Sequence, residues 1–206
     1  MNVVTIDLDI IMEPNINLYN DWVGTESYID DFIKDHSLLE NIKANFYIYE
    51  YLTRYIIKTI KKLSANKVFF ITNHDTIINY IEKGIVNLYN IDHHHDIFYG
   101  EDEEINLPLL TPSCGNWVKY LFDNKKIKQY TWIKNSNSIE PTNNITKVYK
   151  HTTNLLKLVN LNELAENTDM LFICASPEWV PTNFMPLFDS WIAICEEYYG
   201  EPFKVI

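Results

Sequence analysis

Glycine is scarce in this sequence, and no glycine-rich loop occurs. The five glycines are Gly24, Gly84, Gly100, Gly115 and Gly200, and no two of them are close together. The phosphate-binding loops of dinucleotide enzymes and of P-loop NTPases need closely spaced glycines so that the backbone can approach a phosphate. The sequence therefore argues against both classes of enzyme.

Cysteine is equally scarce. The three cysteines, Cys114, Cys174 and Cys195, are odd in number, widely separated and without a C-x-x-C pair. A disulfide framework or a zinc knuckle needs paired and regularly spaced cysteines. We therefore expect a protein of a reducing, cytoplasmic compartment.

Long apolar runs and an excess of positive charge are also missing. No apolar run approaches the ~20 residues of a membrane span, and the first residues lack the basic and apolar segments of a secretory signal. The formal net charge of −11 disfavours nucleic acid or an anionic membrane surface as a partner. We expect a soluble chain with neither partner, forming a single domain over its 206 residues.

Short apolar runs alternate with helical patterns along the chain. Buried-type strands are predicted at residues 3–6, 67–72, 85–89, 127–133 and 170–175. Amphipathic helices are predicted at about residues 38–63, 76–82, 117–122, 161–164 and 185–198. Strands that are apolar throughout and alternate with helices are typical of an α/β domain with a parallel sheet.

The predicted strand at 85–89 leads into the motif Asp92-x-His94-x-Asp96. Residues at alternate positions leave the same face if the strand stays extended. Two carboxylates and an imidazole on one face are costly to bury unless a cation lies between them. Mixed carboxylate and imidazole ligands suit manganese, iron or zinc better than calcium. A polar loop with a chance run of histidines is the alternative.

Two other predicted strands end in similar residues. Asp7 and Asp9 follow the strand at 3–6 and, being two positions apart, are again expected on one face of an extended chain, and His74 follows the strand at 67–72. Ligands of open α/β sheets bind at the carboxyl ends of the strands, which favours a metal or catalytic role. The alternatives are a turn cap for one aspartate, which leaves the other unexplained, and a structural role for His74. Asp75 is expected to be the N-cap of the next helix.

These strand ends together supply four carboxylates and two imidazoles: Asp7, Asp9, His74, Asp92, His94 and Asp96. That is more negative charge than one divalent ion is normally given. Two ions about 3.5–4 Å apart that share bridging carboxylates would balance it and hold a hydroxide between them. Such a hydroxide attacks a polarised trigonal carbon, so the pattern predicts metal-assisted hydrolysis.

The combination resembles the arginase/agmatinase superfamily, whose binuclear manganese ligands come from a strand-end His, a D-x-H-x-D motif and a D-x-D pair. His74, Asp92-x-His94-x-Asp96 and Asp7-x-Asp9 match these three elements. The segment 108–116, which ends in Ser-Cys-Gly-Asn, is similar to the family's loop that ends in Ser-Gly-Asn and contacts the amino acid part of arginine. The resemblance implies a three-layer αβα fold with a mostly parallel sheet, like that of arginases and deacetylases, and two Mn²⁺ ions.

In this chain the D-x-D pair precedes D-x-H-x-D, which reverses the order of ordinary arginases, and the chain is markedly shorter than arginases of free arginine. A short version with D-x-D first resembles the peptide arginases of ribosomal peptide biosynthesis. These enzymes convert arginine side chains of a precursor peptide to ornithine and release urea. The resemblance therefore implies an arginine-containing precursor peptide as partner.

The resemblance also implies how the metal ligands divide. Asp7 and Asp92 would bridge the two Mn²⁺ ions. His74 and Asp96 would complete the first ion. Asp9 and His94 would complete the second.

Roles on the substrate side follow from the same resemblance. Glu178 would hold the guanidinium by charge-assisted hydrogen bonds, and Cys114, Asn116 and Trp117 would line the substrate approach. The family's proton-transfer histidine falls on Val118, so either His93, His95 or His151 replaces it or this residue is absent. The expected catalytic residues are Asp96, His95 and Glu178.

Three other functions stay open. Asp7 and Asp9 could be the nucleophile and acid of a haloacid-dehalogenase-like phosphatase with Mg²⁺, but His74 and residues 92–96 would then have no role. The acids could instead hold a structural ion in a protein without catalysis. Within the ureohydrolase chemistry, free arginine or agmatine is the alternative substrate.

Overall fold

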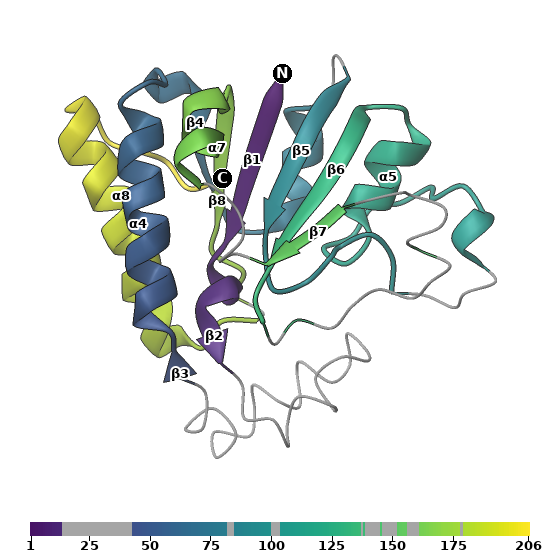
Figure 1. Cartoon of the computed structure of the whole chain (residues 1–206), viewed down its shortest axis with the longest axis horizontal. Coiled ribbons are helices and arrows are strands. Elements are labelled where there is room, and N and C mark those ends of the chain that lie inside the picture. Colours follow the sequence, from purple (N-terminus) through teal and green to yellow (C-terminus); the bar gives the residue numbers. More distant parts are fainter. Residues whose placement is uncertain are drawn as a thin grey trace.

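The structure is a computed structural model. It describes residues 1–13, 43–81, 85–99, 104–136, 138, 145, 152–155, 161–177 and 179–206. Helices cover both sides of a parallel sheet within these residues (Figure 1). The prediction of an α/β fold with three layers is therefore confirmed at this level.

The sheet has six strands in the order β4-β8-β1-β5-β6-β7. Their bounds are β1 Asn2–Asp7, β4 Val68–Ile71, β5 Val86–Ile91, β6 Ile127–Lys134, β7 Thr152–Leu155 and β8 Met170–Cys174. Every neighbouring pair among them is parallel. Consequently the carboxyl ends of the strands lie along one edge of the sheet, the lower edge in Figure 1.

The central strand β1 sets up the site because it has β8 on one side and β5 on the other. Ile6 of β1 pairs with Ile91 of β5, and Asp7 pairs with Cys174 of β8. The last residues of these three strands are therefore neighbours. Successive side chains of β1 alternate between two apolar cores, with Val4 in one and Val3 in the other.

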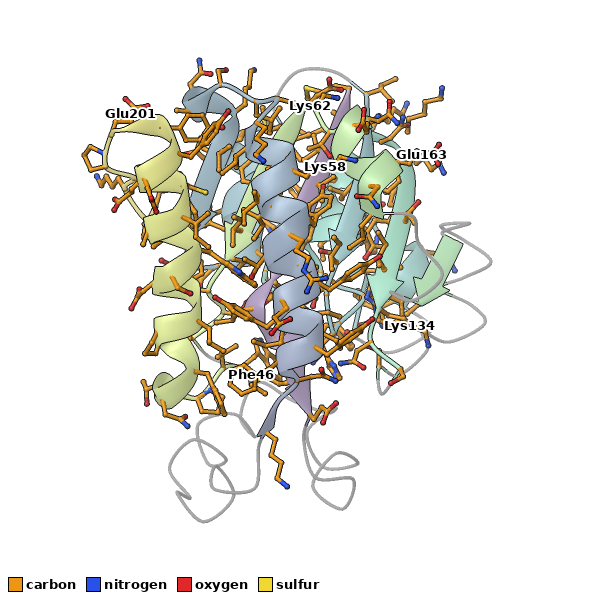
Figure 2. The ribbon with its side chains drawn as sticks, turned by 60° about the vertical axis from the view of Figure 1, so that its left-hand side comes forward. Phe46, Lys58, Lys62, Lys134, Glu163 and Glu201 are labelled. Carbon is orange, nitrogen blue, oxygen red and sulfur yellow. The ribbon has the colours of Figure 1, made fainter. Side chains whose placement is uncertain are left out.

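The first core lies under α4 (Phe46–Ile60), α7 (Leu161–Asn167) and α8 (Met185–Tyr199), and these helices face the viewer in Figure 2. The helix α4 begins at the N-cap Asn45, whose side chain accepts a hydrogen bond from Ile48 N at 3.1 Å. Its buried side chains recur every three to four residues, while Phe46 at the first turn is exposed. The second core lies under α5 (Trp117–Asp123) and the 3₁₀ helix η3 (His74–Asn79).

Shorter elements complete the description. The strands β2 (Met12–Glu13) and β3 (Lys43–Ala44) form an antiparallel pair beyond the carboxyl edge of the sheet (Figure 1). Four other 3₁₀ turns are η1 Leu8–Ile11, η2 Ala65–Lys67, η4 Glu104–Asn106 and η6 Thr182–Phe184. Among the described helices, none combines the length and the apolar composition needed to cross a bilayer.

The predicted strands and helices are found, with different ends. The helix predicted at 38–63 begins at Phe46 and ends at Ile60, and residues 38–42 lie outside the described part. The helix predicted at 76–82 is the 3₁₀ turn η3, and Asp75 is not its N-cap. Asn73 is extended and occupies the N-cap position, because the turn already begins at His74. The strand β7 was not predicted.

Candidate metal centre

The D-x-D pair lies where β1 turns out of the sheet. Asp7 is the last residue of the strand, and Asp9 lies in η1. Oδ1 of Asp7 accepts a hydrogen bond from Asp9 N at 3.0 Å, so Asp7 caps this turn. The expectation of one extended face is therefore wrong for this pair, because the side chain of Asp7 pulls the backbone into a turn. Both carboxylates are nevertheless buried.

The D-x-H-x-D motif also lies in a turn rather than in a strand. β5 ends at Ile91, and residues 92–96 follow it as a series of bends. Oδ1 of Asp92 accepts a hydrogen bond from His94 N at 2.8 Å, and Asp96 has a φ of 49°. The predicted alternation along an extended strand is wrong here too. The compact turn still directs the side chains of Asp92, His94 and Asp96 to one centre.

One group of ligand atoms surrounds His74. Its Nδ1 lies 3.1 Å from Oδ2 of Asp7 and 3.2 Å from Oδ2 of both Asp92 and Asp96. A single N–H cannot donate to three carboxylates, whereas a cation can be shared by a ring nitrogen and several oxygens. Nε2 of the ring lies 2.7 Å from Oγ1 of Thr5. If Nε2–H donates to Thr5, Nδ1 keeps a lone pair for an ion.

A second group surrounds His94. Its Nδ1 lies 2.7 Å from Oδ2 of Asp9, and potential ligand atoms of Asp9, Asp92 and His94 all lie within 4.8 Å of one another. The same holds for His74, Asp92 and Asp96. Asp92 thus belongs to both groups. The structure brings all six predicted metal ligands together and divides them around Asp92.

Two of the carboxylates are held by donors behind them. Asn90 Nδ2 donates to Oδ2 of Asp92 at 2.9 Å, and Trp117 Nε1 donates to Oδ2 of Asp96 at 2.8 Å. The backbone carbonyl of Asp96 also accepts a hydrogen bond from Val118 N at 3.1 Å. Such partners fix the orientation of metal ligands and are typical of metal centres.

The carboxylate of Asp7 has its neighbours on β8 and in the turn that follows this strand. Oγ of Ser176 donates to Oδ2 of Asp7 at 2.5 Å. The thiol of Cys174 lies 3.3 Å from that hydroxyl and forms a further potential ligand group with Asp7 and His74. Burial and the charge of Asp7 raise the pKa of the Cys174 thiol well above its ordinary value, and only a thiolate is a good ligand.

Sequence reasoning missed four polar residues of this centre: Thr5, Asn90, Cys174 and Ser176. A signal for them exists, because each lies within two residues of a predicted ligand or a strand end. Their side chains could be assigned only once the order of the strands was known.

The electrostatics of the cluster call for a cation. Burial raises the pKa of Asp7 to about 6, although His74 opposes the shift. Burial raises the pKa of Asp9 and Asp96 well above ordinary values, and neighbouring carboxylates add to both shifts. Burial favours a higher pKa for Asp92 too, but His74 holds it below its usual range. Burial lowers the pKa of His74, and the surrounding carboxylates outweigh this, so it lies well above normal.

These shifts show that the carboxylates resist carrying their full charge together while buried. A divalent cation would relieve this repulsion, and carboxylate and imidazole groups are suitable ligands for it. The residues present therefore fit a metal site at the carboxyl edge of the sheet.

The centre is open to solvent on the side of His94. The side chain of His94 is 18% exposed, whereas those of the other five predicted ligands are at most 7% exposed. The ring centroid of His94 lies 4.6 Å from that of Trp179 and 6.3 Å from that of Tyr99. Two aromatic rings thus flank the exposed ligand.

The predicted substrate-side residues fall in different places. Trp117 is fully buried and lies behind Asp96, so it offers no surface to a substrate. Cys114 and Asn116 are partly exposed in a turn closed by a 2.7 Å hydrogen bond from Ser113 N to Asn116 Oδ1. A Cβ at Gly115 in this turn would lie only 3.1 Å from the ring of Tyr99, which packs against it. Substrate contact by Cys114 and Asn116 stays a prediction.

His95 supports the loop after β5. Its ring stacks on Tyr99 with centroids 4.3 Å apart, meets Trp132 edge-on, and its Nδ1 accepts a hydrogen bond from Ile97 N at 3.1 Å. It lies outside the ligand groups described above. A proton-transfer role for His95 stays a prediction.

Burial and the neighbouring His94 lower the pKa of His93, the second candidate for proton transfer, to about 3. Glu178 and His151 lie outside the described residues. Their expected roles therefore also stay predictions.

Comparison of the chain with family models, with curated proteins and with solved structures finds no match.

Proposed function

We propose that this protein is a metal-dependent hydrolase of the arginase type, which converts arginine side chains of a peptide to ornithine and releases urea. The observation that carries the proposal is the position of Asp92 in two carboxylate–imidazole groups at the carboxyl edge of a parallel sheet. A carboxylate shared between two such groups is the arrangement expected of a centre with two metal ions.

The proposed metal is Mn²⁺, with two ions per chain. Three residues would hold the first ion: His74, Asp92 and Asp96, with Asp7 beside them. Asp9, Asp92 and His94 would hold the second. When bound, such ions lower the pKa of water and so supply a nucleophile at neutral pH.

The chain's own residues would hold the substrate and move protons. The reaction breaks the bond between the guanidinium carbon and the nitrogen that stays on the side chain, and that nitrogen must gain a proton. Asp96 and His95 are the proposed proton carriers, and Glu178 is the proposed partner of the guanidinium. Trp179 and Tyr99 flank the exposed side of the centre, and aromatic rings are good contacts for a flat guanidinium.

A peptide substrate is favoured by two sequence features. The Asp-x-His-x-Asp motif, the Asp-x-Asp pair and the strand-end His resemble the ureohydrolases, and the order of these motifs resembles that of their peptide-modifying members. The net charge of −11 suits a basic peptide better than an acidic one.

The phosphatase alternative is weaker. It assigns roles to Asp7 and Asp9 alone. Nδ1 of His74 lies 3.1 Å from Asp7, and Nδ1 of His94 lies 2.7 Å from Asp9. A phosphatase reaction at Asp7 would leave both imidazoles and their carboxylate neighbours without a function.

The test is incubation of the protein with Mn²⁺ and an arginine-containing peptide, followed by intact mass and a urea assay. Free arginine, agmatine and a generic phosphate ester are assayed in parallel. We expect a loss of CH₂N₂ per arginine, one urea for each loss, and no release of phosphate. Urea from a small guanidine alone would keep the reaction and change the substrate. Phosphate release, or no reaction on any guanidine with the metals bound, would contradict the proposal.

The matched variants are Asp92→Asn and Asp189→Asn. Asp189 is an exposed residue of α8, so Asp189→Asn makes the same chemical change outside the centre. We expect Asp92→Asn to abolish urea release and Asp189→Asn to leave it unchanged.

A further inference from the structure

We propose that Ser176 is a positioning residue of the metal centre, whose hydroxyl holds the carboxylate of Asp7 in the orientation that receives an ion. The inference deepens the proposed function and rests on its metal centre, although not on the reaction or the substrate. Neither the sequence motifs nor the predicted ligand set includes Ser176.

The backbone at Ser176 is the first reason. Its φ of 43° lies in the left-handed region, which is unfavourable for every residue that has a Cβ and in which glycine is the usual choice. A serine at such a position, next to a buried charged cluster, suggests that its hydroxyl is needed there. The site is not a mobile tip, because Ser176 is buried and its N–H donates to Thr72 O at 3.1 Å.

The hydroxyl of Ser176 is aimed at a ligand. It donates to Oδ2 of Asp7 at 2.5 Å. The strands bring the two residues together, because Asp7 pairs with Cys174 two residues before Ser176. The two residues are 169 positions apart in sequence, so no short motif connects them.

Two hydrogen bonds hold the carboxylate of Asp7 and leave room for an ion. Oδ1 accepts from Asp9 N and Oδ2 accepts from Ser176. A carboxylate has about four lone-pair sites, so each oxygen keeps about one for an ion. Oδ2 at the same time lies 3.1 Å from Nδ1 of His74. Without the hydroxyl, only Oδ1 would be held, and Oδ2 could turn away from the ion beside His74.

The turn that begins at Ser176 also reaches the second ligand group. The carbonyl of Ser176 accepts hydrogen bonds from Trp179 N at 2.9 Å and Val180 N at 3.0 Å. These bonds place the ring of Trp179 against His94, with centroids 4.6 Å apart. One short turn after β8 thus contacts a ligand from each group.

The experiment measures metal affinity rather than turnover. Wild type and four variants, Ser176→Ala, Ser176→Gly, Ser176→Thr and Ser190→Ala, are titrated with Co²⁺, followed by its visible absorption, and with Mn²⁺ in competition. Each is also unfolded by denaturant without metal. Ser190 serves as control because its hydroxyl donates to Leu187 O within α8.

We expect the metal affinity to depend on whether the side chain at position 176 has a hydroxyl group. We expect the stability to depend on how well the residue tolerates the left-handed backbone. We expect Ser176→Ala and Ser176→Gly to weaken metal binding by about 10- to 100-fold, the usual effect of losing a partner of a metal ligand. Ser176→Thr keeps the donor and should bind within a few-fold of wild type. Glycine tolerates the left-handed backbone, so Ser176→Gly should unfold at a higher denaturant concentration than Ser176→Ala.

Three results would overturn the inference: unchanged affinity in Ser176→Ala, an equal loss in Ser176→Thr, or an equal loss in Ser190→Ala. Because Ser176→Gly relieves the backbone, a folding defect in Ser176→Ala does not remove the test. A wild type that binds metal without releasing urea would contradict the proposed reaction and leave the role of Ser176 standing. A wild type that binds no divalent metal would contradict both.

Discussion

Oδ2 of Asp9 lies 2.7 Å from Nδ1 of His94, and this contact joins the turn after β1 to the turn after β5 across 85 residues of sequence. Oδ1 of the same carboxylate accepts a hydrogen bond from His93 N at 3.2 Å. One buried side chain therefore holds the D-x-H-x-D turn by its backbone and by its histidine. Asp9 is both a candidate ligand and the link between the two motifs.

Substitution of the shared carboxylate should remove both of the proposed ions. Asp92 belongs to both ligand groups, whereas Asp96 belongs to the group of His74 alone. Under limiting free Mn²⁺, we expect Asp92→Asn to retain neither ion after dialysis and Asp96→Asn to retain one. Elemental analysis of the dialysed proteins gives the ratio of metal to chain. Loss of both ions from Asp96→Asn, or retention of both by Asp92→Asn, would contradict the division of the ligands.

Metal should stabilise the protein more at pH 7 than at pH 5. The pKa of Asp7 is raised to about 6, and those of Asp9, Asp96 and His74 also lie above their ordinary values. Ions must displace the protons these groups keep at pH 5, so affinity rises with pH. A metal at one hundred times its Kd adds about 2.7 kcal/mol to the unfolding free energy. Thermal unfolding with Mn²⁺ or with a chelator at the two pH values measures the difference, and an equal gain at both would contradict it.

In the metal-free protein, Asp7 should lower the stability of the fold as the pH rises. An acid whose folded pKa is raised binds its proton more tightly in the folded state, so it destabilises the fold increasingly as the pH rises from about 4 to 6. Relative to wild type, metal-free Asp7→Asn should therefore gain stability over this range, by at most about 3 kcal/mol. Denaturant unfolding in chelator at pH 4 and pH 7 measures the gain. A difference that does not change with pH would be inconsistent with a raised pKa.

The indole of Trp117 should contribute to metal binding although it is buried behind the ligands. Trp117→Phe keeps a large aromatic ring and removes the donor to Asp96. We expect a loss of about 1–3 kcal/mol in stability, because a buried acceptor loses its partner, together with weaker binding of the ion beside His74. Trp191→Phe is the matched control, since its Nε1 donates to Thr53 in the packing of α4 and α8. Trp191→Phe should lower the stability by a similar amount and leave the metal affinity unchanged.

Trp179 should affect the substrate more than the metal. Its ring flanks His94 on the exposed side of the centre. A cation over an indole contributes about 0.5–2 kcal/mol, so Trp179→Ala should raise KM for an arginine peptide by about 2- to 30-fold, and Trp179→Phe by less. Steady-state kinetics at saturating Mn²⁺ separate KM from kcat. A fall in kcat with an unchanged KM would place Trp179 outside the substrate path.

Much of the fold could be predicted because the pattern of apolar residues is strong. The strands β1 and β8 are buried at nearly every position, which is the pattern of a parallel sheet, whereas β6 includes the exposed residues Lys128 and Gln129. The residues at which helices and strands begin and end were harder to predict. α4 begins where Asn45 can cap it, and η3 begins at His74 because Asn73 is still extended. The strand β7 is short and polar, so its sequence carries little periodic signal.

The pattern of residues was sufficient to identify the six side chains of the candidate centre. They follow apolar runs, and parallel strands direct their carboxyl ends to one edge. The residues after β4, β1 and β5 meet because these strands lie close together in the order β4-β8-β1-β5. The arrangement of these side chains depends on how the chain folds. The strand order β8-β1-β5 set Ser176 beside Asp7, and side-chain capping bent Asp9 and residues 92–96 out of the extended form. Hydrogen bonds between residues far apart in sequence depend on strand order and on local turns, and neither is encoded in the spacing of a motif.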